Sequence, residues 1–266
     1  MEAIARHQQV RPQKRRSSSF KTWLYAVLSA GLVFGMWQLA TILFDIPTYI
    51  LPTPVEVTFT AFEERQRILD AIGVTGLEAV GGFIVGNFTG FLAATLIAYS
   101  TTAARTLLPI GLAIQSIPIV ALTPFLTLLF GRGFATVMII AAIIVFFPTL
   151  VNGVLGFRSV RAEALEMLGI MSASDWQVFW HLRFPTALPN LFAAFRIGAA
   201  TSILGAMIAE WVTTGSGLGY LILQAGVNFE VELMWAAILI SSMLALTALA
   251  LISLVENLLC PWIVET

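Results

Sequence analysis

Long apolar segments alternate with short polar ones along the whole chain of 266 residues. The apolar segments cover residues 22–44, 71–99, 106–130, 134–157, 186–209 and 233–255. A helix of about 20 apolar residues crosses the roughly 30 Å hydrocarbon core of a bilayer, so each segment is long enough to span it. The pattern therefore predicts an all-α protein, a polytopic bundle of six transmembrane helices.

The first apolar segment follows a basic polar tail at residues 1–21, an order that is also typical of a secretory signal peptide. The segment is longer than a signal-peptide core and lacks a clear cleavage site, so we interpret it as a retained span. We expect two regions, a cytoplasmic tail over residues 1–21 and a transmembrane domain over residues 22–266.

The distribution of basic residues predicts the orientation of the bundle. With both termini in the cytoplasm, the inner segments carry ten Lys and Arg residues: Arg6, Arg11, Lys14, Arg15, Arg16, Lys21, Arg105, Arg158, Arg161 and Arg183. The outer segments then carry only Arg65, Arg67 and Arg132. Because short cytoplasmic loops are enriched in basic residues, we expect a multi-pass protein with both termini inside.

Composition narrows the function further. The chain is 58% hydrophobic and 11% charged, against about 25% charged residues in soluble domains. Its net charge of −1 gives no indication of nucleic-acid binding. Lys14 and Lys21 are the only lysines, so a phosphate-binding loop is absent and another chain would have to hydrolyse any nucleotide. His7 and His181 lie far apart in the sequence, and we expect no metal site, bound cofactor or catalytic residue.

A charged stretch at residues 158–185 separates the fourth and fifth apolar segments. It predicts two short helices, the first capped by Ser159 and the second by a capping box that starts at Ser174. We expect the second helix to end at Phe184, because a residue that precedes a proline, here Pro185, disfavours the helical conformation.

Two interpretations of this hairpin remain open. Glu163 and Asp175 stand in the first turns, where the helix dipole favours an anion. Trp176 belongs to an apolar side that is too short to cross a bilayer. The hairpin could lie on the lipid surface as an amphipathic element, or a soluble partner could bind it from the cytoplasm.

Three ionisable residues stand within or at the ends of spans, namely Glu78, Arg196 and Glu210. Each costs about 2.5–3.5 kcal/mol if it faces lipid, so we expect each to face the bundle interior or an aqueous cavity. Glu210 is the strongest candidate for a pathway or gate, and an ion pair that orders the bundle is the alternative. Arg196 could instead extend its side chain to the membrane interface and have no role in the pathway. Glu78 could instead have a purely structural role.

Glycine and proline predict the character of two spans. Six glycines in the second span indicate a helix that packs closely against neighbours. Three prolines in the third span make a straight helix unfavourable there.

Gln115, Ser116 and Pro118 put polar side chains and freed carbonyls near mid-membrane, which suits a translocation path, although a buried kink explains them too. A glycine-rich segment at 210–232 predicts an outer or re-entrant turn near a gate.

The stretch at residues 158–189 resembles the cytoplasmic coupling loop of binding-protein-dependent ABC importer permeases. That signature reads Glu-Ala-Ala, three residues, Gly, nine residues, then Ile-x-Leu-Pro. Aligning its proline with Pro185 places its glutamate on Glu166 and its glycine on Ser172, which is a departure from the pattern. An alternative register on Glu163 misplaces the proline by three positions.

The resemblance extends from residue 50 onward, through residues 50–54, 115–124, 146–152, 209–211 and 217–222. These segments look like the nitrate, sulfonate and taurine branch of the family. At the position of Glu78 the sulfonate permeases resemble one another in having arginine. With a glutamate there, and with the segments at 115–118 and 146–148, the chain is more similar to permeases for riboflavin and thiamine-pyrimidine precursors.

The resemblance implies a type I ABC importer permease in the bacterial inner membrane. It implies a second permease copy, ATP-binding cassette ATPase subunits that use ATP and Mg²⁺, and an extracytoplasmic solute-binding protein. The residues it assigns to ATPase coupling are Glu163, Ala164, Glu166, Ser172, Asp175, Trp176 and Pro185. The rival function is a secondary transporter driven by an ion gradient through Glu78 and Glu210. A membrane enzyme is a more distant alternative, because the sequence shows no catalytic constellation.

Overall fold

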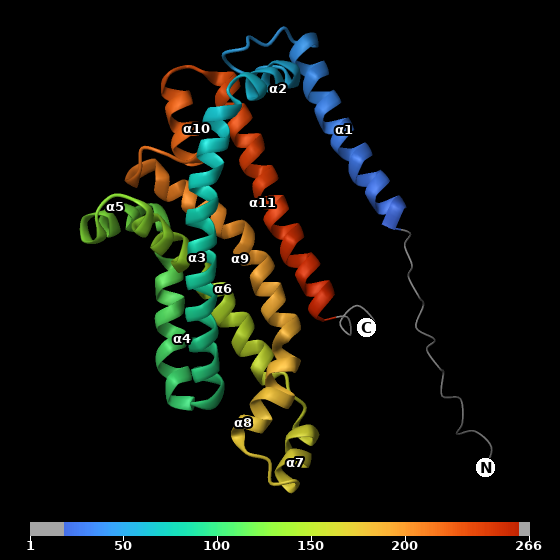
Figure 1. The fold of residues 1–266 in the computed structure, drawn as a ribbon, viewed down its shortest axis with the longest axis vertical. Coiled ribbons are helices and arrows are strands. Elements are labelled where there is room, and N and C mark those ends of the chain that lie inside the picture. Colours follow the sequence, from blue (N-terminus) through green and yellow to red (C-terminus); the bar gives the residue numbers. More distant parts are fainter. Residues whose placement is uncertain (1–18, 261–266) are drawn as a thin grey trace, which may run out of the picture. The chain divides into compact units, whose positions relative to one another are not determined.

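The computed structural model describes residues 19–260, and this part of the chain folds into helices joined by short links (Figure 1). The helices are α1 (Ser19–Leu43), α2 (Pro54–Glu63), α3 (Arg65–Tyr99), α4 (Thr101–Ser116), α5 (Ile119–Phe130), α6 (Phe134–Arg158), α7 (Ala162–Ile170), α8 (Asp175–Val178), α9 (Phe184–Thr213), α10 (Leu218–Val227) and α11 (Val231–Leu259). A π-helical turn, Phe179–Arg183, joins α8 to α9. The chain divides into two compact units, and the boundary follows Glu56.

The first unit contains α1 and the link that leads into α2. Trp37 donates from its indole nitrogen to the carbonyl of Pro52 at 3.1 Å. The Thr53 amide donates to the Glu56 carboxylate at 2.8 Å, and the Glu56 amide donates to the Thr53 hydroxyl at 3.2 Å. This reciprocal capping box fixes the start of α2. The cytoplasmic tail expected at residues 1–21 falls almost entirely outside the described residues.

The described helices match up to five of the six predicted membrane segments. Four helical segments of the described chain are long and apolar enough to cross a bilayer, namely α3, α6, the continuous stretch Asp175–Thr213 and α11. The α4–α5 pair meets the same criteria together. The first predicted span corresponds to α1, but its described apolar part, Val27–Leu43, is shorter than the other spans, so the sixth span is not confirmed within the described residues. The all-helical membrane fold is confirmed.

The third predicted span, residues 106–130, is a broken one. Its two halves, α4 and α5, meet at an angle of 101°. The break falls at Ile117 and Pro118, where Ile117 has an extended conformation, as expected for a residue that precedes proline. Pro109 and Pro124 lie inside α4 and α5 without ending them. The prolines therefore predicted the bend correctly, but only Pro118 stands at the break.

Three helices, α3, α6 and α9, form the centre of the second unit and pack most extensively on one another. Gly82, Gly86 and Gly90 recur every fourth residue of α3 and face α6. A Cβ on Gly86 would lie 2.6 Å from the carbonyl oxygen of Ala142, so the two backbones approach as closely as glycine allows. The prediction that the second span is a packing helix is confirmed.

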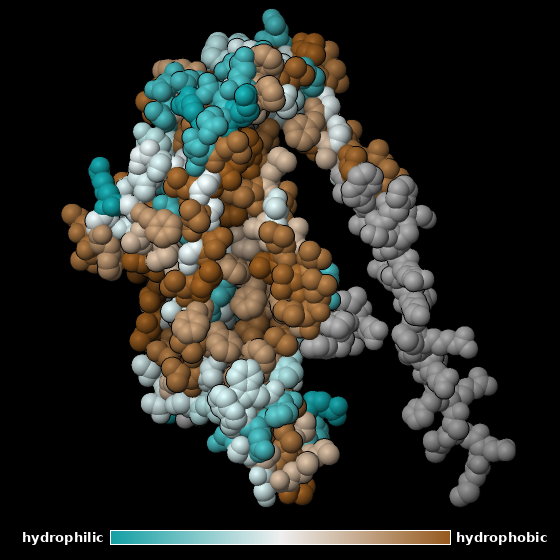
Figure 2. Space-filling model, in the orientation of Figure 1, coloured by the Kyte–Doolittle hydropathy of each residue, from teal (hydrophilic) through white to brown (hydrophobic). Residues whose placement is uncertain are grey.

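Two apolar clusters fill this centre. One lies near α7 and α8 and includes Phe157, Phe179 and Leu191, and the other lies towards α10 and includes Ile140 and Ile203. Many large apolar side chains remain exposed on the outer faces of the helices. Over the second unit, Figure 2 shows brown surface between teal patches near α7 and near α10. This distribution is that of a bundle whose sides face hydrocarbon.

Two expectations about the hairpin helices are wrong. Ser159 does not cap the first helix; it donates its hydroxyl to the carbonyl of Gly156, and α7 starts three residues later at Ala162. The second helix does not end at Phe184. The Phe184 amide bonds to the carbonyl of Phe179, five residues back, in the π-helical turn. Pro185 then falls in the first turn of α9, a position where proline is common.

Candidate functional site

Glu210, one of the three predicted ionisable residues, stands near the end of α9 and is 0% exposed. Its Oε1 accepts a hydrogen bond from the Thr75 hydroxyl at 2.6 Å, and its Oε2 accepts one from the Gly219 amide at 2.6 Å. The Thr75 oxygen in turn accepts from the Leu218 amide at 2.7 Å. Side chains from α3 and α9 therefore cap the N-terminus of α10, where the helix dipole favours an anion.

The glycine segment before α10 makes room for this carboxylate. Gly217 caps α10 with φ +98°, a conformation that residues with a Cβ rarely adopt. A Cβ on Gly217 would also collide with the carboxyl group of Glu210. The sequence prediction of a tight turn here is confirmed, and the turn encloses a buried carboxylate.

Glu78, on α3, packs against this cluster. It is 1% exposed. Its Oε2 oxygen is buried and has no hydrogen-bond partner among the described residues. The fold thus brings two of the predicted pathway residues together.

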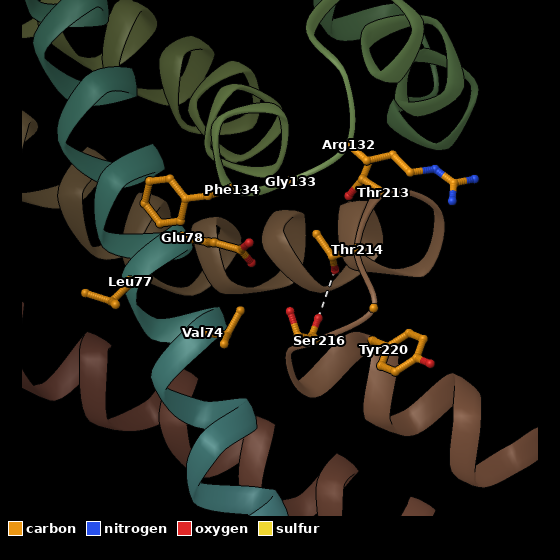
Figure 3. Close-up of a pocket in the computed structure, with 11 residues that line it drawn as sticks. Val74, Leu77, Glu78, Arg132, Gly133, Phe134, Thr213, Thr214, Ser216 and Tyr220 are labelled. Atoms are coloured by element: carbon orange, nitrogen blue, oxygen red, sulfur yellow. Dashed lines mark hydrogen bonds between the residues drawn. The ribbon is translucent and has the colours of Figure 1, made fainter.

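Glu78 also lines a cavity of about 660 Å³, which we call the acid pocket. Its walls include Val74 from α3, Phe134 from the start of α6 and Tyr220 from α10. Figure 3 shows the carboxyl of Glu78 directed into the pocket, while the guanidinium of Arg132 points away from it. Within the described residues, no cluster of His, Cys, Asp or Glu side chains could hold a metal ion.

The other predicted pathway residues lie apart from the acid pocket. Gln115, Ser116 and Pro118 surround the break between α4 and α5 and are exposed in the single chain. The Ser116 hydroxyl donates to the carbonyl of Leu112 on its own helix, at 2.8 Å. The pocket lining does not include these residues, so the structure does not join the two groups into one site.

Arg196, on α9, forms an ion pair with Glu256 on α11. Glu256 is buried, whereas Arg196 is partly exposed. Sequence reasoning missed Glu256, because it stands one residue beyond the predicted end of the last span. It also missed Thr75, although a hydroxyl three residues before Glu78 on the same helix lies near the face of that glutamate.

At the opposite end of the central helices, the charged hairpin projects from the bundle (Figure 1). No residue of α7 is buried. Ile170 is 86% exposed and Trp176 is 70% exposed, so large apolar groups lie on this surface beside the carboxylates of Glu163 and Glu166. Surfaces that mix exposed apolar and charged groups in this way are typical of protein–protein contacts.

The turn between α7 and α8 explains the departure at Ser172. Its φ of +54° lies in the left-handed region that glycine adopts most readily. The Ala173 amide donates to the carbonyl of Leu168 at 3.0 Å, and the Ser172 amide donates to that of Gly169 at 3.0 Å. These two bonds define a Schellman motif with Ser172 at its left-handed position. Serine therefore holds a conformation typical of glycine.

The hairpin is firmly attached to the bundle. Ser174 and Gln177 form the predicted capping box at the start of α8. Phe179, in the π-helical turn, is buried in an aromatic cluster with Phe157. Arg183 donates to the carbonyl of Phe157 at 3.0 Å and lies over the ring of Tyr99. The hairpin is therefore packed on the bundle where α9 begins.

Residues 86–263 match the model of a protein family described as the binding-protein-dependent transport system inner membrane component. The chain belongs to this family. It is therefore a membrane permease component of such a transport system, as the resemblance in its sequence indicated.

Individual relatives agree with this assignment. The riboflavin transport system permease protein RibX of Chloroflexus aurantiacus is 33% identical over 87% of this chain and 87% of its own length. The formylaminopyrimidine transport permease protein ThiX of Halalkalibacterium halodurans is 28% identical over 90% of this chain and 97% of its own. A probable ABC transporter permease protein of Haemophilus influenzae is 32% identical over 82% and 89% of the two chains.

A solved structure supports the same fold. The chain is similar to a chain of the MetNI methionine ABC transporter in an inward-facing conformation, with a TM-score of 0.59 and 19% identity. The match covers 72% of this chain and 94% of the other. The fold is therefore that of an ABC importer permease.

Proposed function

We propose that two copies of this permease form the translocation path of an ATP-driven importer, with its hairpin docked on an ATPase subunit. The observation that carries the proposal is the hairpin itself, exposed over α7 and continuous with a central helix of the bundle. The ATPase would use ATP and Mg²⁺, and an extracytoplasmic binding protein would deliver the solute. The membrane is the bacterial inner membrane.

The proposed orientation places the hairpin and both termini in the cytoplasm. The basic residues Arg158, Arg161 and Arg183 around the hairpin support it, because cytoplasmic segments are enriched in arginine. In this orientation the acid pocket lies towards the external face. Solute from the binding protein would reach the pocket before it crosses the rest of the bundle.

The coupling follows from the continuity of one helical segment. Asp175–Thr213 runs without interruption from α8 through the π-helical turn to the end of α9. Closure of the ATPase subunits on ATP would displace the hairpin, and the aromatic cluster at Phe179 would transmit that displacement to α9. The far end of α9 carries Glu210 and holds α10. Access would thus alternate by movement of packed helices.

The substrate class is proposed from the relatives. RibX and ThiX are named for riboflavin and formylaminopyrimidine transport, at 33% and 28% identity. Relatives named for aliphatic sulfonates, taurine and nitrate are 23–27% identical to this chain. We therefore place a small heteroaromatic solute ahead of a sulfonate or nitrate. The comparisons give no support to an ion-gradient carrier.

The test is the coupling of solute transport to ATP hydrolysis in the assembled complex, reconstituted with its ATPase and binding protein. Glu166→Ala should leave the permease inserted in the membrane but lower solute-stimulated ATPase activity roughly tenfold, the effect of about 1.4 kcal/mol at the docking contact. Glu163→Ala tests the alternative register of the signature. Glu63→Ala, an exposed carboxylate at the end of α2, is the control. Unchanged coupling in Glu166→Ala would contradict the assignment, and uptake without ATP would contradict the function.

A further inference from the structure

Oε2 of Glu78 is buried without a hydrogen-bond partner in the described part of the chain. Such an atom costs about 1–3 kcal/mol, and folded proteins satisfy most of their buried polar groups. Both oxygens of Glu210 are acceptors for Thr75 and Gly219, and a carboxylate has no proton to donate, so Glu210 does not supply the missing donor. The donor that Oε2 requires must therefore come from outside this cluster.

The acid pocket gives such a donor access to Glu78. Its volume of about 660 Å³ lies within the range of about 300–1,000 Å³ that small-molecule sites occupy. Val74, Leu77 and Phe134 supply apolar walls, and Tyr220 supplies an aromatic ring. In Figure 3 the carboxyl of Glu78 points from α3 towards Thr214, whereas Leu77 lies on the other side of α3. A compact, partly apolar molecule fits this combination of groups.

The pocket offers an acceptor at Glu78, and several donors of its lining are bonded elsewhere or point away from this position. The Thr213 and Thr214 hydroxyls already donate to the backbone carbonyls of Ala209 and Ser216. The guanidinium of Arg132 points away from Glu78 in Figure 3. An oxyanion at Oε2 would face a carboxyl oxygen, and in a buried site that repulsion is weakly screened. An N–H or O–H group would instead satisfy it.

We propose that the acid pocket is a solute-binding subsite of the permease, in which Oε2 of Glu78 accepts a hydrogen bond from an N–H or O–H group of the solute. The proposal rests on the proposed transport function and adds a selectivity to it. The pocket favours a neutral or cationic heteroaromatic solute with N–H donors over an oxyanion. Water supplies the donor when the pocket holds no solute.

Protection of a thiol in the pocket tests the proposal in the reconstituted complex. Ser216→Cys, at an exposed position in the lining, is introduced together with Cys260→Ser, which removes the native thiol. The rate of alkylation is measured with riboflavin, 4-amino-2-methylpyrimidine, methanesulfonate or nitrate. At least one of the two N–H donors should slow alkylation about threefold or more, and neither oxyanion should. Equal protection by the oxyanions, or protection by none of the four probes, overturns the proposal.

Glu78 variants separate binding from general damage to the fold. Glu78→Leu should abolish the protection, and Glu78→Gln, which keeps one acceptor oxygen, should retain part of it. Glu63→Gln, outside the pocket, should retain all of it. If Glu78→Leu fails to fold, Glu78→Gln still tests the proposal. If the N–H donors protect the thiol fully in Glu78→Gln, and the oxyanions protect it equally well, the proposed selectivity is contradicted.

ATP-dependent uptake in the same vesicles distinguishes the two proposals. Uptake that requires ATP without any pocket protection overturns the subsite alone. Uptake that proceeds without ATP overturns the proposed function.

Discussion

The hydroxyl of Thr75 lies 2.6 Å from Oε1 of Glu210 and joins three helices through one oxygen atom. It donates to the carboxylate of Glu210 on α9 and accepts from the Leu218 amide at the start of α10. All three residues are buried. Removal of this hydroxyl would leave a carboxylate oxygen and an amide without this partner at a buried site.

Thr75→Val should therefore destabilise the permease although it keeps the shape of the side chain. Each unsatisfied buried polar group costs about 1–3 kcal/mol, so we expect a loss of about 2–4 kcal/mol in the free energy of unfolding. Denaturant titration of the purified chain in detergent micelles measures it. Thr75→Ser keeps the hydroxyl and should lose less than about 1 kcal/mol. A loss in Thr75→Val no larger than that in Thr75→Ser would contradict the dominant role of the hydroxyl.

The sequence was sufficient to locate the membrane helices, because length and apolarity determine what can cross a bilayer. It was insufficient for the partners of Glu210, since Thr75 stands 135 residues away and only tertiary packing brings it near. The end of the second hairpin helix was predicted wrongly at Phe184. Local preferences of the residue before a proline favour a break there, but a π-helical turn places Pro185 where a helix tolerates it.

The packing of α3 on α6 gives a second prediction. A Cβ on Gly86 would lie 2.6 Å from Ala142 O and 2.8 Å from Val145 Cβ, so Gly86→Ala forces the helices apart. We expect a loss of about 1–3 kcal/mol in the free energy of unfolding. Gly76→Ala, on the same helix, meets no atom within 4 Å and should be neutral or stabilising by up to about 1 kcal/mol. The same titration compares them, and an equal response would contradict close packing at Gly86.

The left-handed residue in the hairpin gives a third prediction, in which the substitution increases stability. Ser172 has φ +54°, and a left-handed conformation costs a residue with a Cβ about 1–2 kcal/mol more than it costs glycine. Ser172→Gly should therefore stabilise the turn, by about 1 kcal/mol after the entropy that glycine loses on folding. Hydrogen–deuterium exchange of the Ser172 and Ala173 amides should slow about fivefold. Ser174→Ala, which removes the capping box of α8, should quicken exchange in α8. Faster exchange in Ser172→Gly would contradict the Schellman geometry.

The ion pair between Arg196 on α9 and Glu256 on α11 gives the last prediction. Glu256 is buried, so neutralising Arg196 strands a carboxylate, whereas Arg196 is partly exposed and can reach water when Glu256 is neutralised. Arg196→Gln should therefore cost more than Glu256→Gln, about 2–3 kcal/mol against about 1 kcal/mol, because solvent screening reduces the cost on the exposed side. The double substitution Arg196→Glu with Glu256→Arg should recover part of the loss, since opposite charges face each other again. Denaturant titration of the wild type, Arg196→Gln, Glu256→Gln and the variant with both Gln substitutions forms a cycle that isolates the pair. Additive losses with no recovery would show that the two side chains contribute independently and that no ion pair links α9 to α11.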